Sequence, residues 1–145
     1  MSSTDSATEK YRTCRRVIAT AVLLLVAALG YRLTPAFRST YVVGFCTVPD
    51  DTVGERIVDA LVSRHLAACV NSVRGIESAY WWEGKVERSS ENLLIVKTQS
   101  SLTGQVTEAI RELHPYDVPE VVFMPIHAGL PAYLSWIGQS TALAK

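Results

Sequence analysis

The chain has 145 residues, of which 48% are hydrophobic and 19% charged, so its composition excludes a chain that is disordered throughout. The formal net charge is zero, but residues 1–40 carry a net charge of +4 and residues 41–145 carry −4. An acidic domain lacks the basic surface that nucleic-acid binding requires, so we expect no nucleic-acid partner.

The first forty residues indicate a leader rather than part of the fold. A polar and basic stretch precedes residues 17–30, VIATAVLLLVAALG, which carry no charge. That run is shorter than the about 20 apolar residues of a spanning helix and is typical of a signal peptide, although Tyr31 and Leu33 would extend it into a tilted anchor. We therefore divide the chain into residues 1–40, a signal or anchor segment with a linker, and residues 41–145, the folded domain. The expected location is the secretory pathway or a membrane, with mitochondrial and cytoplasmic locations as alternatives.

The folded domain opens with a strand and a helix. Residues 41–47, YVVGFCT, form a short apolar run that is typical of a buried strand. Thr52 and Glu55 have the spacing of a capping box, in which the threonine oxygen accepts an amide hydrogen bond and the glutamate reaches back. Apolar residues then recur at helical spacing up to Leu66, which predicts an amphipathic helix.

A long β-hairpin follows. Residues 67–73 and 76–82 predict its first strand, and residues 86–98 predict the returning strand. Glu83-Gly84 between them is a tight-turn signal. Ser89-Ser90 suggests a bulge, and the apolar second half of the returning strand predicts burial on both faces.

The last part of the chain predicts helix, strand and helix. Ser100 or Ser101 is expected to cap a helix that Pro115 ends. Residues 118–126 predict a strand, and prolines near both of its ends favour an edge position. Pro131 opens a short final helix. The order β-α-β-β-α-β followed by α predicts an α+β fold of the ferredoxin-like, split β-α-β type.

Three adjacent aromatic residues lie at the end of the predicted hairpin. Tyr80, Trp81 and Trp82, followed by Glu83, would expose an apolar patch on a monomer. Association with other copies of the chain would cover the patch, and the alternative is that the rings fold back onto their own core. We expect these four residues to lie at an interface between subunits.

Residues 114–120, HPYDVPE, allow two interpretations. His114 with Asp117 or Glu120 would suit metal binding or acid–base chemistry, and Cys46 would complete a set for copper or zinc if the fold brings it close. Alternatively, His114 ends a helix and the two prolines stiffen a corner. Dispersed ligand types are a weaker signal than a spaced Cys/His cluster, so composition favours the structural interpretation.

The remaining chemical signals are sparse. Cys14, Cys46 and Cys69 are odd in number and form no CxxC motif, which argues against a disulfide framework and a structural zinc site but leaves a Cys46–Cys69 bridge open. No GxSxG, P-loop or GxGxxG motif is present, so no catalytic reaction is predicted. Lys97 lies in a predicted buried strand and needs an anionic partner, which Glu91 or a carboxylate of another chain would supply.

Six segments together carry a resemblance to a known family. They are CTVPD, LAACVN, SAYWWEGKVE, ENLLIVKT, HPYDVPE and YLSWI, in this order over residues 46–137. The sequence is similar to the CutA family of divalent-cation tolerance proteins, and the apolar segment before the domain resembles the animal members.

The resemblance implies a ferredoxin-like subunit in a tight homotrimer, an association with copper or other divalent metal ions, and no catalytic activity. It carries a metal role over to Cys46 and His114, which we extend to Glu120, although Leu113 stands where bacterial copper-binding members have a second histidine. We expect Lys97 and Tyr116 to line a groove between subunits. The alternative function is a trimeric assembly or anchoring protein of the secretory pathway, because animal members are linked to acetylcholinesterase.

Overall fold

The structure is a computed structural model that describes residues 20–21 and 39–142. The predicted signal or anchor segment over residues 17–30 lies outside the described residues, apart from Thr20 and Ala21. Within the part of the chain that is described, no helix has the length and apolar character needed to cross a membrane.

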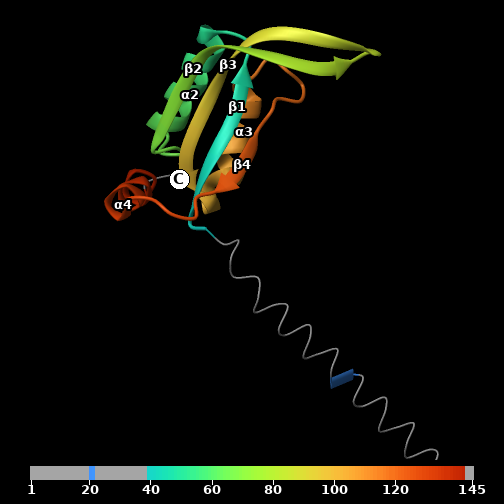
Figure 1. The fold of residues 1–145 in the computed structure, drawn as a ribbon. Coiled ribbons are helices and arrows are strands. Elements are labelled where there is room, and N and C mark those ends of the chain that lie inside the picture. The colour runs from blue at the N-terminus through green and yellow to red at the C-terminus, as the bar shows by residue number, and fades with distance from the viewer. Residues whose placement is uncertain (1–19, 22–38, 143–145) are drawn as a thin grey trace, which may run out of the picture. The chain divides into compact units, whose positions relative to one another are not determined.

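Residues 39–142 form a four-stranded antiparallel sheet with helices packed against it. The strands are β1 (Tyr41–Val48), β2 (Cys69–Trp82), β3 (Lys85–Gln99) and β4 (Val122–Pro125), in the spatial order β2-β3-β1-β4. Helices α2 (Asp51–Ser63) and α3 (Thr103–Leu113) cover one face of the sheet (Figure 1). This arrangement confirms the predicted α+β, ferredoxin-like split β-α-β fold.

The hydrophobic core lies between that face and the two helices. Alternate residues of β1 point into it, so Cys46 and Val48 are fully buried while their neighbours are half-buried. The helices contribute Ile57, Leu61, Val106 and Ile110. Leu94 and Val96 of β3 are buried in the core, but Leu93 and Ile95 are only half-buried on the other face. The expected burial of β3 on both faces is therefore wrong for the single protomer, because its helices cover only one side.

Both long helices begin differently from the predictions. Asp50, not Thr52, is the N-cap of α2, and its Oδ1 accepts a hydrogen bond of 2.8 Å from the Val53 amide. A 3₁₀ turn, η2 (Ser100–Leu102), precedes α3, which has no side-chain cap. The predicted serine cap is wrong because the Ser100 hydroxyl donates instead to the Ser39 carbonyl.

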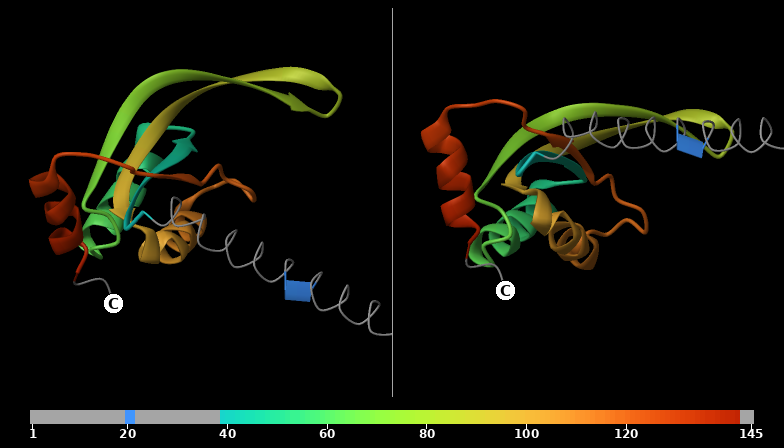
Figure 2. Two further views of the ribbon diagram at one scale, coloured as in Figure 1. Left: turned by 60° about the horizontal axis from the view of Figure 1, so that its bottom comes forward. Right: turned by 90° about the horizontal axis from the view of Figure 1, so that it is seen from below.

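The β2–β3 hairpin extends past the rest of the sheet as a curved arm (Figures 1 and 2). Its turn is Glu83-Gly84, as predicted, and both residues have positive φ, 45° and 83°. The bulge lies between Val73 and Ile76, where Gly75 has a φ of 70°, and not at Ser89-Ser90. A glycine adopts this conformation without steric cost, so the irregularity forms there.

The end of the chain departs most from the predicted pattern. The strand expected over residues 118–126 shortens to the four residues of β4, at the edge of the sheet, and Val118 before it is 88% exposed. A long connection leads from β4 to α4 (Pro131–Ser140), which begins with proline as predicted (Figure 2). Ile137 of α4 is fully buried, and Gln99 donates to Thr141 just after the helix. These contacts hold α4 against the end of the sheet opposite the hairpin turn.

Candidate functional site at the His114 corner

His114 fastens the corner after α3 to the end of β1. The helix stops at Leu113, and the His114 amide still donates to the Ile110 carbonyl at 2.9 Å. Its Nε2 donates to the Thr47 carbonyl at 2.9 Å, and its Nδ1 accepts from the Tyr116 amide at 3.1 Å. Both ring nitrogens are therefore used, in a neutral tautomer assigned from these partners. Only 8% of the His114 surface is exposed, so this buried side chain links the corner to β1 by its hydrogen bonds.

Cys46 precedes Thr47, the hydrogen-bond partner of His114, but its side chain faces the core. Its surface is fully buried on β1, and burial, followed by the nearby carboxylates of Glu120 and Glu91, raises the pKa of the thiol to about 12. The thiolate is the form that binds metals, so the raised pKa makes loss of the Cys46 proton on metal binding more costly than it is for an exposed cysteine. Both described cysteines are free, which rules out the Cys46–Cys69 bridge left open by the sequence.

The three predicted metal ligands lie in one region without forming a metal cluster. Glu120 acts electrostatically on Cys46, and His114 is bonded to Thr47, the residue after Cys46. In residues 20–21 and 39–142, however, no three His, Cys, Asp or Glu side chains are arranged to hold a metal ion. The hydrogen bonds of His114 and the raised pKa of the Cys46 thiol do not fit a preformed copper site.

Tyr116 and Lys97, the two residues expected in a groove, have separate surroundings. The Tyr116 hydroxyl donates to Glu91 Oε1 at 3.3 Å, and burial followed by the charge of Glu91 raises the pKa of this tyrosine. The Lys97 ammonium donates to Asn71 and lies 3.9 Å from the Cys69 sulfur. Glu91 is therefore not the partner of Lys97, because the lysine side chain turns to the neighbouring strand β2.

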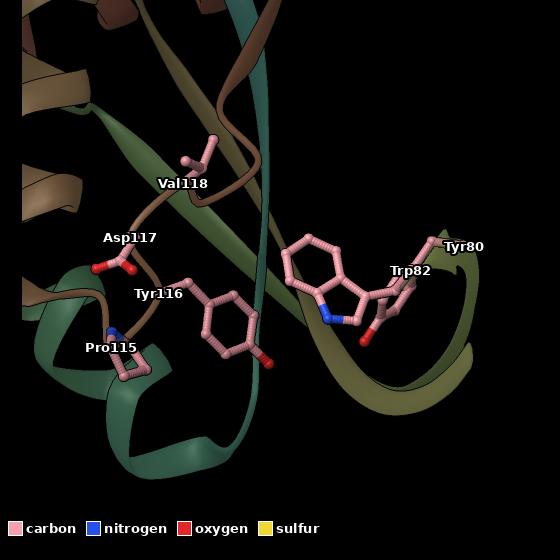
Figure 3. A pocket seen from close by; sticks show the side chains of 6 residues that line it. All are labelled: Tyr80, Trp82, Pro115, Tyr116, Asp117 and Val118. Carbon is pink, nitrogen blue, oxygen red and sulfur yellow. The ribbon is translucent and has the colours of Figure 1, made fainter. Parts of the chain in front are cut away.

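The aromatic residues of the hairpin face this corner across a cavity. Tyr80 and Trp82 come from β2, and the segment from Pro115 to Val118 forms the opposite wall of a cavity of about 560 Å³ (Figure 3). The Tyr116 ring points toward Trp82, whereas the Asp117 carboxylate points away from the hairpin. A second cavity of about 440 Å³ shares Tyr80, Tyr116 and Val118 and adds Glu91 and Glu120.

Glu91 belongs to this site, although the sequence suggested it only as a partner of Lys97. Only 6% of its surface is exposed, although it is an acidic residue of a strand. The signal in the sequence is its place in ENLLIVKT, immediately before the alternating buried residues of β3. An acidic residue at the start of such a run is usually solvated at a strand end, so the pattern alone did not show that Glu91 is buried.

Comparisons with known proteins match the folded domain. The family model described as CutA1 divalent ion tolerance protein matches residues 41–140. Protein CutA 1, chloroplastic, of Oryza sativa subsp. japonica is 50% identical over 100 residues, which are 69% of this chain and 56% of that protein. The Xenopus laevis Protein CutA homolog is 44% identical over 120 residues, 79% of this chain and 80% of the relative.

A solved structure agrees with the fold as well. The crystal structure of CutA1 from Oryza sativa aligns with a TM-score of 0.70 and 48% identity, covering 71% of this chain and 94% of that one. The described domain therefore corresponds to nearly all of that solved chain, while the match spans little more than half the length of the rice relative.

Proposed function

This chain belongs to the CutA1 divalent ion tolerance protein family, and from that premise we propose that it acts as a non-catalytic homotrimer in the response to divalent metal ions. The family supports the role in metal tolerance.

The observation that carries the proposal is the apolar surface of the protomer. Trp81, Trp82 and Val86 on the hairpin are 71%, 59% and 60% exposed. Val122 and Met124 are 48% and 52% exposed on β4, at the opposite edge of the sheet. Apolar patches of this kind mark interfaces between proteins, and a closed ring of identical copies would bury the hairpin of each one.

The edges of the sheet also support association. Strands β2 and β4 are the outermost strands, and among the described residues each pairs with only one neighbour. Unpaired edge groups readily accept another strand, so a hairpin arm from a second copy would satisfy both the hydrogen bonds and the apolar contacts. Tyr80, Trp81, Trp82 and Glu83 are the residues we place in this interface.

The oligomeric state of the full-length protein tests the trimer. Light scattering behind size-exclusion chromatography should give three times the protomer mass of 15.9 kDa. Replacing both Trp81 and Trp82 with serine should shift the mass toward one protomer, because the interface loses its largest apolar side chains. Val62→Ser is the matched control, since Val62 is 41% exposed on α2, away from the hairpin. A wild-type mass of one protomer would refute the trimer.

We propose no catalytic reaction because neither Cys46 nor His114 is available as a reactive group. A nucleophile needs an adjacent base or a lowered pKa, whereas burial raises the pKa of Cys46 to about 12. Both nitrogens of His114 hold the corner.

Copper is the metal that we propose first, and its binding at Cys46, His114 and Glu120 would require a local rearrangement. The thiol would have to lose its proton, and His114 would have to release one of its two hydrogen bonds. Titration of the full-length protein with Cu(I) and Cu(II) against a competing chelator tests this. Loss of binding in both Cys46→Ala and His114→Ala would support the site, and binding indifferent to both changes would refute it.

A further inference from the structure

Lys97 places a positive charge beside the sulfur of Cys69. The two residues pair across strands β2 and β3, at the end of the ladder farthest from the hairpin turn. The Lys97 ammonium lies 3.9 Å from the Cys69 sulfur and also donates to the Asn71 side chain. None of the six ion pairs of the described residues includes Lys97, so a carboxylate there does not neutralise its charge. The ammonium therefore favours a negative charge on the sulfur.

Two further donors point at the same sulfur. The amide nitrogen of Asn71 lies 3.7 Å from it. Helix α4, which lies beside this end of the sheet (Figure 2), contributes the Tyr133 hydroxyl. Burial, followed by the charge of Cys69 and a hydrogen bond to it, raises the pKa of Tyr133. Donors from β2, β3 and α4 thus surround one sulfur, and such surroundings favour the thiolate, which is the nucleophilic form of cysteine.

Cys46 has the opposite surroundings in the same chain. Its thiol is fully buried and donates to the Thr47 carbonyl at 3.5 Å. Burial, followed by the charges of Glu120 and Glu91, raises the pKa of this thiol to about 12. The protein therefore carries one half-buried sulfur among donors and one fully buried sulfur among carboxylates, so a reagent that attacks thiolates should select Cys69.

Hydrogen peroxide is the reagent that suits this cluster best. It is small and uncharged, so it can reach a half-buried sulfur, including one in a groove between subunits. Its reaction with a thiolate expels hydroxide, and the Lys97 ammonium and Tyr133 hydroxyl would stabilise the charge that develops on the leaving oxygen. A metal ion would instead be repelled by Lys97, and among the described residues no three His, Cys, Asp or Glu side chains are arranged to hold one.

We propose that Cys69 is a peroxide-sensitive thiol, which hydrogen peroxide oxidises to a sulfenic acid with the help of Lys97 and Tyr133. The thiol first gives its proton to the solvent. The sulfur then attacks one peroxide oxygen, so that an S–O bond forms while the O–O bond breaks. Sulfur loses two electrons, the peroxide gains them, and the expelled hydroxide takes a proton from the solvent to become water. The products are one sulfenic acid and one water, in a stoichiometric modification that lies beyond the proposed response to metal ions.

Oxidation of the full-length protein by excess hydrogen peroxide in the presence of dimedone, which traps sulfenic acids, tests the proposal. Mass spectrometry of the peptides separates Cys69 from Cys46 and Cys14. We expect Cys69 to be labelled at least about tenfold faster than Cys46. Lys97→Met should slow labelling of Cys69 by about tenfold, because a charged donor is lost, whereas Lys97→Arg should keep most of the rate.

Two controls separate chemistry from folding. Arg111→Met, at an exposed ion pair on α3, should label like wild type. The Cys46 rate in each sample reports unfolding, because an unfolded chain exposes both sulfurs. If Lys97→Met raises that rate, Tyr133→Phe decides instead, since it removes one hydroxyl and keeps the ring, and it should slow labelling of Cys69.

The proposal fails if Cys69 of wild type is labelled no faster than Cys46. It also fails if a folded Lys97→Met, or Tyr133→Phe in its place, labels at the wild-type rate, since the cluster would then not activate the sulfur. Failure of copper binding or of trimer formation leaves the result unaffected, because the labelling rates measure neither.

Discussion

At the scale of single residues, the role of a side chain depends on its hydrogen bonds and its protonation. The sequence left open whether the fold brings Cys46 close to His114, and the structure bonds His114 to Thr47, the residue after Cys46. The sequence could not show that both imidazole nitrogens are bonded or that the thiol is buried among carboxylates. The bond between His114 and Thr47 joins segments that are 67 residues apart in the chain.

Removing the His114 ring should destabilise the fold. His114→Ala leaves the Thr47 carbonyl and the Tyr116 amide without their partner in a site that is only 8% exposed. We expect the free energy of unfolding to fall by about 2 to 4 kcal/mol, as measured by urea denaturation. Gln105→Ala, at an exposed position of α3, is the control and should change it little. An unchanged stability of His114→Ala would contradict the structural role of the ring.

The Cys46 thiol should make the stability depend on pH in the alkaline range. Its pKa rises from an ordinary value of 9.0 to about 12 in the folded protein, so the unfolded chain loses the proton first. Below pH 9 this group therefore contributes no pH dependence, and above it the stability falls by up to about 1.4 kcal/mol per pH unit until about pH 12.

The difference between wild type and Cys46→Ala isolates that contribution, because lysines and tyrosines titrate equally in both. Denaturation curves recorded from pH 8 to pH 11 should show a steeper loss of stability in wild type. Parallel curves for the two proteins would show that the thiol does not carry the effect.

At the scale of elements, the spacing of apolar residues predicted the order and type of the strands in the sheet and of the helices packed against it. The errors lie at boundaries. The α2 cap moved to Asp50 because the chain is already extended there, and the bulge formed at Gly75 rather than at a pair of serines. The strand predicted over residues 118–126 kept only the residues that pair with β1, since pairing depends on a distant partner that the local sequence does not specify.

The hairpin turn supplies a test at this scale with a matched pair of glycines. Gly84 has a φ of 83°, so Gly84→Ala should cost about 1 to 2 kcal/mol because a side chain is strained in that region. Gly104 lies in α3 with open space around it, so Gly104→Ala should stabilise by about 0.5 to 1 kcal/mol. Thermal unfolding of the two variants at one protein concentration should shift the midpoint in opposite directions, and shifts of the same sign would refute this account of the turn.

At the scale of the whole molecule, the protomer leaves much of its apolar surface for partners. The helices cover one face of the sheet, while the hairpin arm and β4 remain exposed. If three copies bury these surfaces, stability depends on association as well as on the core of each copy. The midpoint of thermal unfolding should then rise with protein concentration, which differential scanning calorimetry over a hundredfold dilution series would measure. A midpoint independent of concentration would indicate that the protomer is stable alone.

The strand order also affects the order in which the parts of the sheet form during folding. The two strands of the hairpin are joined by a two-residue turn, so they can pair by zipping outward from Glu83-Gly84. Strand β4 pairs with β1 across 77 to 83 residues, from Phe45 with Val122 to Val42 with Pro125, and closing so long a loop is slow. A ribosome-bound chain would therefore present a finished hairpin before β4 has left the exit tunnel. During that interval the open side of β1 is the part of the nascent chain most in need of protection by a chaperone.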